Sequence, residues 1–258
     1  LPSNKIELWA RIESDRLLHP VFRDFYTERN VILEERGQRV ETSPDGKLYE
    51  SFMKTAYATH PYGIPILGWP EDIKHMNPRA LRNIHRMYLT PSNIVIAVVG
   101  DIDTPKTLKL LHQYFGHIPK TRIKAKPIPS EPPQNQERRV NVFFDANPMM
   151  IIGYHKPTAP AVDDYVFDVL ETILSKGRTS RFYSSLVVEK QIAESISAHN
   201  GVPATRYANL FAIFARPRHP HSNDELQKAI DVELENIIGK PVPDEELAKA
   251  KKQMKMDF

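Results

Sequence analysis

The stretch that most constrains this chain is residues 21–40, VFRDFYTERNVILEERGQRV. Steps of four, three, four and three residues place Val21, Phe25, Glu28, Ile32 and Glu35 on one stripe of an amphipathic helix. Because Glu28 and Glu35 are two helical turns apart, both carboxylates project from nearly the same face. A carboxylate on a core-facing stripe is costly unless an Arg, a Lys or a metal ion meets it there. The stretch therefore predicts a helix whose acidic side needs a positive partner.

The pattern alone leaves the identity of that partner open. In the simpler interpretation, Glu35 pairs with Arg39 at i,i+4 spacing and the stripe is partly solvated, because glutamate is common on exposed helices. In the other interpretation, a metal ion supplies the positive charge. The neighbouring Glu34 points about 100° away from Glu35 around the helix, and we interpret it as a solvated surface charge.

The composition excludes several classes of protein. With 35 Lys and Arg against 32 Asp and Glu, the formal charge of +3 is too balanced to argue for nucleic-acid binding. The chain has no Cys, which excludes disulfides and thiolate metal ligands. No run is long and apolar enough to span a membrane. At 258 residues and 41% hydrophobic content, the chain is typical of a soluble globular protein with two ordinary domains or one large one.

Hydrophobic periodicity and Pro/Gly punctuation predict helices mixed with short strands. The run NIVIAVV at 93–99 is continuous, apolar and β-branched, which is typical of a strand buried on both faces. The sequence SPDG at 43–46 predicts a turn, and HPYGIP at 60–65 predicts a rigid loop. The other predicted strands are 140–145, 149–155, 192–200 and 207–215. The predicted helices are 5–18, 48–58, 78–88, 104–114, 163–174, 179–189, 224–238 and 244–256, with a short helical turn from Pro70.

A shift in composition divides the chain into two parts. Residues 119–139 are rich in Lys, Pro, Gln and Glu, which is typical of a boundary between domains. We therefore predict α+β structure on both sides, with a first domain at 1–120, a linker at 121–138 and a second domain at 139–258. The chain opens on Leu1 and closes on a helical pattern with no Gly or Pro after it, so we expect an internal piece of a longer polypeptide.

An ordered set of motifs resembles the pitrilysin/insulinase-type zinc peptidases, the inverzincins, and within them the bacterial processing-protease-like members. The motifs are ERNVILEE at 28–35, AYATHPYGIPILGWPEDI at 56–73, YLTPSNIVIAVVGDID at 88–103, YFGHIP at 114–119 and LSKGRTSRFYSSLVVEKQIAESISA at 174–198. The resemblance implies two related α+β domains, each a mostly antiparallel sheet packed with helices. The first domain would be incomplete at its N-terminus, and the second would be non-catalytic. The resemblance also implies a zinc-dependent endopeptidase that hydrolyses peptides or small proteins through a zinc-bound water.

Carried over by resemblance, Glu35 matches the third zinc ligand of the family. Glu28 matches the acidic residue one heptad earlier, which supports the zinc site from behind the ligands. The family's His-x-x-Glu-His motif does not occur in this sequence, so we expect the other two ligands and the general base upstream of Leu1. With one zinc ligand of three and no catalytic residue, the 258-residue chain alone is predicted neither to hold Zn²⁺ nor to cleave peptides.

The remaining histidines and the second half of the chain supply no replacement site. The pairs His219/His221 and His112/His117 have weak metal-like spacing and are interpreted as solvated, whereas His60 is assigned to the Pro-bounded loop. The positions where the family's non-catalytic half carries a substrate-facing Arg and Tyr hold Val187 and Glu194. Arg181 is interpreted as structural, capping or pairing near a helix start.

Three functional hypotheses follow from the sequence. The first is a zinc endopeptidase to which this segment supplies one ligand and the second domain. The second is a non-catalytic family member that acts as a partner or structural subunit. The third is a plain peptide-binding module that pairs a strand edge with an extended peptide.

The expected partners follow from the same resemblance. They are a peptide or protein substrate, the N-terminal segment of the same protein, and a second half or partner subunit, with no nucleic acid. We expect a periplasmic or extracellular location, because the resemblance is to exported bacterial members.

Overall fold

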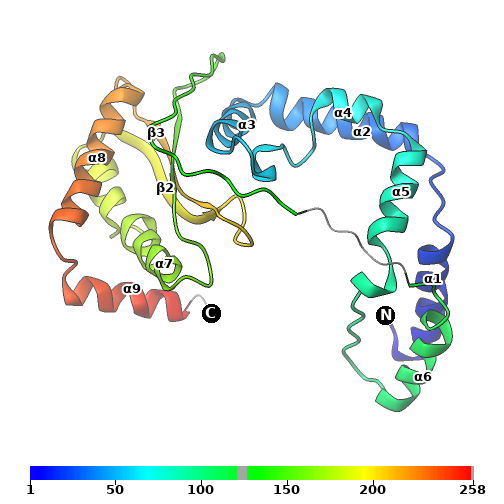
Figure 1. Cartoon of the computed structure of the whole chain (residues 1–258). Helices are drawn as coiled ribbons and strands as arrows, with labels where there is room; N and C mark the ends of the chain where they lie inside the picture. Colours follow the sequence, from blue (N-terminus) through cyan, green and yellow to red (C-terminus); the bar gives the residue numbers. More distant parts are fainter. Residues whose placement is uncertain (121–126, 257–258) are drawn as a thin grey trace. The chain divides into compact units, whose positions relative to one another are not determined.

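The computed structural model describes residues 1–120 and 127–256. The chain forms two compact units, one made of residues 1–36 and 67–127 and the other of residues 37–66 and 128–258 (Figure 1). Residues 37–66 therefore belong with the C-terminal half, although the chain returns to the first unit after them. The predicted domain boundaries at 120 and 139 stay a prediction for the whole protein, and residues 121–126 of the predicted linker lie outside the described residues.

The described part of the first unit is helical. Trp9 packs against Phe115 at a ring-centroid distance of 6.0 Å, and the Tyr114 hydroxyl donates to Glu7 at 2.9 Å, which fixes α1 on α6. The Arg29 guanidinium donates to the carbonyl of Lys74 at 3.0 Å and ties α2 to α4. The elements are η1 (Ser3–Lys5), α1 (Ile6–Leu18), α2 (Phe25–Arg36), α4 (Pro70–His75), α5 (Pro78–Tyr88), η4 (Pro91–Asn93) and α6 (Thr104–Phe115).

Asn93 ends η4, and residues 94–99 belong to no helix and pair with no strand among the described residues, so the predicted buried strand at 93–99 is wrong for this structure. The alternation expected of a strand is still present. Ile94 and Ile96 are half-buried, while Val95 and Val99 are 94% and 95% exposed. A strand needs a hydrogen-bonding partner, and an apolar run cannot supply its own. The first unit thus shows no sheet in its described part, and two related sheet-containing domains are not shown.

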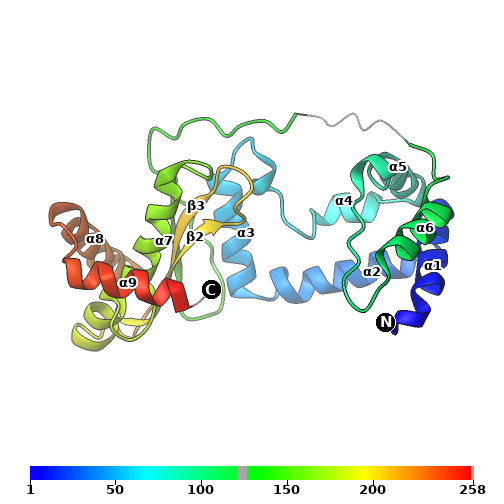
Figure 2. The same ribbon diagram turned by 90° about the horizontal axis from the view of Figure 1, so that it is seen from below.

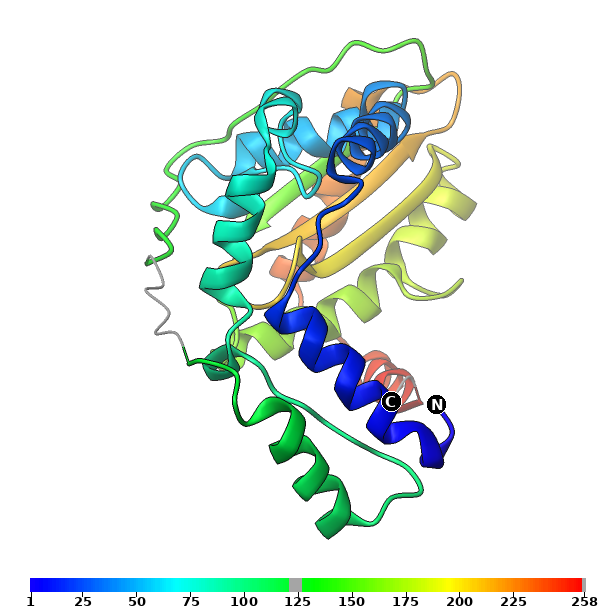
Figure 3. The same cartoon turned by 90° about the vertical axis from the view of Figure 1, so that its right-hand side faces the viewer.

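The second unit is α+β and is built on a three-stranded antiparallel sheet. Its strands are β1 (Met150–His155), β2 (Ala193–Val202) and β3 (Leu210–Pro217). The order is β1-β3-β2, with Ile152 opposite Ile213 and Ala198 opposite Ile213 on the other side (Figure 3). The remaining elements are η2 (Gly37–Glu41), α3 (Pro44–Ala56), η3 (Pro61–Gly63), α7 (Val162–Ser175), η5 (Tyr183–Glu189), α8 (Asn223–Gly239) and α9 (Asp244–Met256).

Helices cover both faces of this sheet (Figure 2). On one face, alternate β3 residues Phe211, Ile213 and Ala215 pack against α7, η5 and α8 in the larger core cluster, in which Leu174 is fully buried. On the other face, Leu210 packs with residues of α3. Gly153 permits that contact, because a Cβ at this position would lie 2.5 Å from the ring of Phe52.

Two local predictions in this unit are wrong, and a third is refined. The SPDG sequence is not a turn but the start of α3, because Ser43 Oγ accepts the N–H of Gly46 as an N-cap and Pro44 occupies the first turn. Residues 140–145 form no strand, and Phe143 is 94% exposed. The helix predicted at 179–189 is present, and most of it is the π-helix η5, in which the N–H of Lys190 donates to the carbonyl of Ser185 at 2.8 Å.

Candidate functional site

The two acidic residues singled out in the sequence lie on α2. Glu28 is exposed in the first turn of the helix, and Glu35 is half-buried near its last turn. Glu34 is exposed, which confirms its interpretation as a surface charge. The stripe is shorter than predicted, because Val21 precedes the helix and is exposed. The alternative pairing of Glu35 with Arg39 stays a prediction.

The described side chains do not bring a complete set of zinc ligands together. Within residues 1–120 and 127–256, no three His, Asp or Glu side chains lie close enough together to hold a metal ion. A catalytic zinc needs three protein ligands, so Glu35 and its described neighbours do not fit a complete zinc centre by themselves. The role of Glu35 as a zinc ligand stays a prediction about a longer polypeptide. No helix in the described residues is long and apolar enough to cross a membrane.

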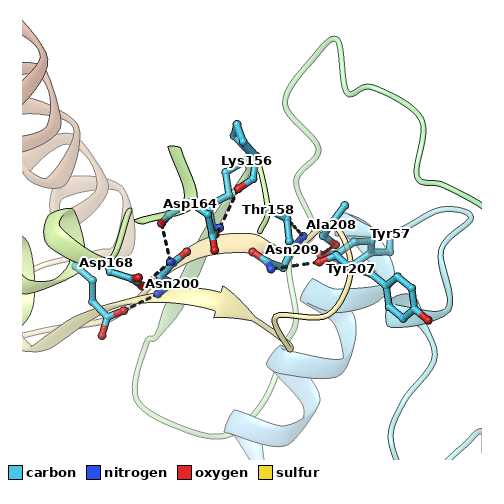
Figure 4. Close-up of polar contacts among 11 residues, drawn as sticks. Tyr57, Lys156, Thr158, Asp164, Asp168, Asn200, Tyr207, Ala208 and Asn209 are labelled. Atoms are coloured by element: carbon cyan, nitrogen blue, oxygen red, sulfur yellow. Dashed lines mark hydrogen bonds and ion pairs between the residues drawn. The ribbon is translucent and has the colours of Figure 1, made fainter. Parts of the chain in front are cut away.

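The second unit contains a buried polar centre that the sequence did not predict (Figure 4). At the end of β1, the Lys156 ammonium forms an ion pair with Asp164 in the first turn of α7, and its side chain is 1% exposed. The same ammonium donates to the carbonyl of Pro157 at 3.1 Å and lies 5.2 Å from the ring centroid of Phe167. Burial of a charge is tolerated only with such pairing.

Asn200 extends this centre from β2 to α7 (Figure 4). Its side-chain amide donates to Asp168 Oδ1 at 2.7 Å, and its backbone N–H donates to Glu171 Oε2 at 2.8 Å. Together with the Lys156–Asp164 pair, these bonds fix the register of α7 on the sheet. The only sign of this polar centre in the sequence is the pair of acidic residues in the first turn of α7, Asp163 and Asp164. Acidic residues are equally typical of an exposed helix N-terminus, so they do not predict a buried ion pair.

Arg181 pairs with α9. Its Nε and Nη2 donate to the two carboxylate oxygens of Glu246 at 2.9 and 2.7 Å, a bidentate geometry. The hydrogen bond from Arg181 lowers the pKa of Glu246, and Glu246 in turn raises the pKa of Arg181. The structural interpretation of Arg181 is confirmed.

The other residues singled out in the sequence are scattered. Val187 lies in η5, and Glu194 is exposed on β2. His112 and His117 are exposed. His60 is buried at the start of η3, within the predicted rigid loop.

Comparison with known proteins decides the family. Residues 75–254 match the model described as "Peptidase M16 inactive domain", which is more than half of the chain. The chain belongs to the M16 peptidase family. The pitrilysin-type resemblance in the motifs is thereby confirmed. A similar curated protein is the zinc protease PqqE of Helicobacter pylori, 32% identical over 239 residues. That match covers 91% of this chain and 53% of the relative, so the M16 chain spans about half the length of PqqE.

Solved structures agree with this assignment. A protease from Helicobacter pylori superposes with a TM-score of 0.86 at 29% identity, covering 99% of this chain and 63% of that one. A chain of complex III from Candida albicans superposes with a TM-score of 0.75 and covers 100% of this chain and 63% of that one. At 19% identity, the second likeness shows the fold alone.

Proposed function

We propose that this M16 chain is a segment of a zinc-dependent endopeptidase, to which it supplies the ligand Glu35 and the second, non-catalytic α+β domain. The observation that carries the proposal is the position of Glu28 and Glu35 on one helix of a chain that is 32% identical to a protein named as a zinc protease. Glu35 is half-buried, whereas Glu28 and Glu34 on the same helix are exposed. The remaining ligands and the general base would come from residues outside this sequence, so the chain alone is expected to be inactive.

A second candidate function is a non-catalytic M16 subunit that pairs with another M16 chain. The observation in its favour is the match of residues 75–254 to the inactive-domain model. The two candidates differ at α2, because a subunit that binds no metal has no need for a carboxylate at position 35.

Three substitutions in the longer native polypeptide test the proposal. Glu35→Gln keeps the size of the side chain but removes its charge, so we expect zinc content and peptide hydrolysis to be lost together. Glu28→Gln is expected to keep most of the metal and to lower zinc affinity or turnover by roughly 10–100-fold. This is the usual effect of changing a residue that contacts the metal ligands and not the metal itself. Glu34→Gln, one residue from the ligand and exposed, is the matched control and is expected to be neutral.

Metal analysis and a peptidase assay with and without chelator give the readout. If the native polypeptide contains no zinc and Glu35→Gln changes nothing, the non-catalytic subunit is the better assignment. If Glu34→Gln removes zinc while Glu35→Gln retains it, then Glu34, and not Glu35, is the residue of α2 that faces the metal. We also propose a periplasmic or extracellular location, which cell fractionation with the native polypeptide tests directly.

A further inference from the structure

The two edges of the sheet differ in how well they are protected against pairing with a further strand. β2 forms one edge, and it carries two register shifts and the exposed polar residues Glu194 and Ser195, which are features that blunt an edge strand. β1 forms the other edge (Figure 3). Its sequence MIIGYH contains no Pro, Lys, Arg, Asp or Glu, and its pairing with β3 is regular. An unprotected apolar edge is a template for another strand, so β1 is the edge where we expect one.

A groove of about 720 Å³ lies along β1, and every residue from 150 to 155 lines it (the β1 groove). Leu48 and Phe52 of α3 line one wall, and Gln227 and Asp231 of α8 line the other. Residues 137–143 line the side that lies opposite β1 along the chain. The helices on the two faces of the sheet therefore extend past its last strand. The groove continues the layers of this unit by the position of one more strand.

Two arginines fix residues 137–143 to both walls of the β1 groove. The Nη1 of Arg138 donates to the carbonyl of Thr55, in the last turn of α3, at 3.2 Å. The Nη2 of Arg139 donates to Gln227 Oε1 of α8 at 2.9 Å. The Phe143 side chain of the same segment is 94% exposed, so this ring does not fill the groove. The segment thus borders the groove without closing it.

Alternate residues of β1 face different walls of the β1 groove. Gly153 faces α3, because a Cβ at this position would lie 2.5 Å from the ring of Phe52. Ile152 packs against the core cluster that contains Leu226 of α8, and Tyr154 lies on the same side as Ile152. A strand added beside β1 has the same alternation. Its side chains therefore point in turn toward the apolar wall of α3 and toward α8.

The α8 wall carries a carboxylate that no cation meets at close range. Asp231 is half-buried, and its side chain has neither a hydrogen bond nor an ion pair within residues 1–120 and 127–256. The nearby Arg139 lies instead against Asp224, with its Nη1 at 3.9 Å from Oδ1. Burial and the charges of Glu235 and Glu137 raise the pKa of Asp231, and Arg139 offsets only part of this effect. A cation placed in the groove beside Asp231 would relieve both costs.

The chemistry of the two walls favours one kind of occupant. We propose that the β1 groove binds an extended peptide, in which apolar residues alternate with Lys or Arg, as an additional strand of the sheet. Backbone hydrogen bonds to β1 supply the affinity, α3 receives the apolar side chains and Asp231 receives a basic one. A second copy of this chain fits less well, because its own β1 contains no Lys or Arg. Binding needs no metal and does not rest on the zinc-peptidase proposal.

Hydrogen exchange of the full chain, read by mass spectrometry, tests the added strand directly. The probe is an end-blocked peptide in which Val and Lys alternate, matched to the six residues of β1. With the peptide at about ten times its Kd, the groove-facing amides of 150–155 should exchange about tenfold more slowly. The amides of 193–202, at the other edge, should not change. The same peptide with alternate backbone nitrogens methylated cannot form the ladder and should give no protection.

Calorimetric titration tests the acidic wall separately. Asp231→Asn keeps the size of the side chain and should weaken binding of the Val/Lys peptide about fivefold, as loss of a partly exposed ion pair does. A peptide in which Val and Glu alternate should bind the parent chain more weakly than the Val/Lys peptide, and Asp231→Asn should reduce that difference. Glu245→Gln removes an exposed carboxylate of α9, outside the groove, and is the matched control that should bind like the parent.

Four outcomes would overturn the proposal. Absence of protection at 150–155, or protection at 193–202 instead, would mean that β1 receives no peptide strand. Equal binding of the methylated peptide would mean that only side chains make contact. Protection at 150–155 that rises with protein concentration and needs no peptide would assign the edge to a second copy. If the longer native polypeptide binds no peptide, another of its segments occupies the edge. The methylated peptide is tested on the parent chain, so it decides the proposal even where a variant fails to fold.

Discussion

The buried pair of Lys156 and Asp164 allows a sharp test of what holds the second unit together. Asp164→Asn leaves the volume nearly unchanged but removes the countercharge from an ammonium that is 1% exposed. Among the described residues, the Lys156 ammonium also contacts the carbonyl of Pro157 and the ring of Phe167, and neither carries a negative charge. Breaking one side of a buried pair costs about 3–5 kcal/mol, so Asp164→Asn should lower the free energy of unfolding by that amount.

Removal of both charges should be far less harmful. In the double variant Lys156→Met/Asp164→Leu, the thioether can pack on Phe167, and no buried charge is left. We expect its free energy of unfolding to lie within about 1–2 kcal/mol of the parent, because apolar replacement of a buried pair is often neutral or better. The coupling free energy between positions 156 and 164 in a double-mutant cycle should therefore be large. Its sign should be opposite to the losses of unfolding free energy caused by the two single substitutions.

Urea unfolding followed by circular dichroism measures these differences in the free energy of unfolding. The m-value shows whether each variant exposes the same surface area on unfolding as the parent chain. Asp163→Asn is the matched control, since Asp163 lies in the same first turn of α7 but is exposed. It should cost no more than about 0.5–1 kcal/mol through the helix dipole. If Asp164→Asn were no worse than Asp163→Asn, or if the double variant lost the sum of the single losses, the reasoning from burial would be refuted.

Helix positions could be predicted because their signals are local. α5 begins at Pro78 after Asn77, whose side chain accepts the N–H of Ala80, and it ends at Tyr88 as predicted. α6 begins after Asp103 in the same way, with the N–H of Lys106 as donor. Caps and prolines act within a few residues, so the sequence displays them directly.

Strands could be predicted only where their partners are present. Residues 149–155, 192–200 and 207–215 were placed within a few residues of β1, β2 and β3, because these segments pair with one another. The run at 93–99 has an equally strong apolar pattern, yet it has no partner among the described residues. Strand pairing depends on two segments, and the residue pattern of one segment does not show whether the other is present.

The polar sites show the same limit more clearly. Glu131 and the N–H groups at 58–60 are joined across more than seventy residues, and both segments have an ordinary loop composition. Lys156 and Asp164 are close in sequence, but nothing in their spacing indicates that the ammonium is buried. Glu35 was singled out by its stripe, and only the family resemblance connected it with zinc.

Three smaller changes extend these tests. Arg181→Lys keeps the charge but loses the bidentate contact with Glu246, and urea unfolding should show a loss of about 1 kcal/mol that disappears as acid protonates Glu246. Ser222→Ala removes the capping box with Glu225 at the start of α8, and it should cost about 1 kcal/mol in the same assay. Val95→Lys tests the unpaired run at 93–99. Because the Val95 side chain is 94% exposed, it contributes almost no buried area, and the substitution should change the free energy of unfolding by less than about 0.5 kcal/mol. A charge on an exposed apolar strand-like segment should also lower self-association in analytical ultracentrifugation, since such segments template edge-to-edge pairing. A loss above 1 kcal/mol in a chain that stays monomeric would mean that Val95 is buried in solution, and that the run at 93–99 finds a partner within the chain.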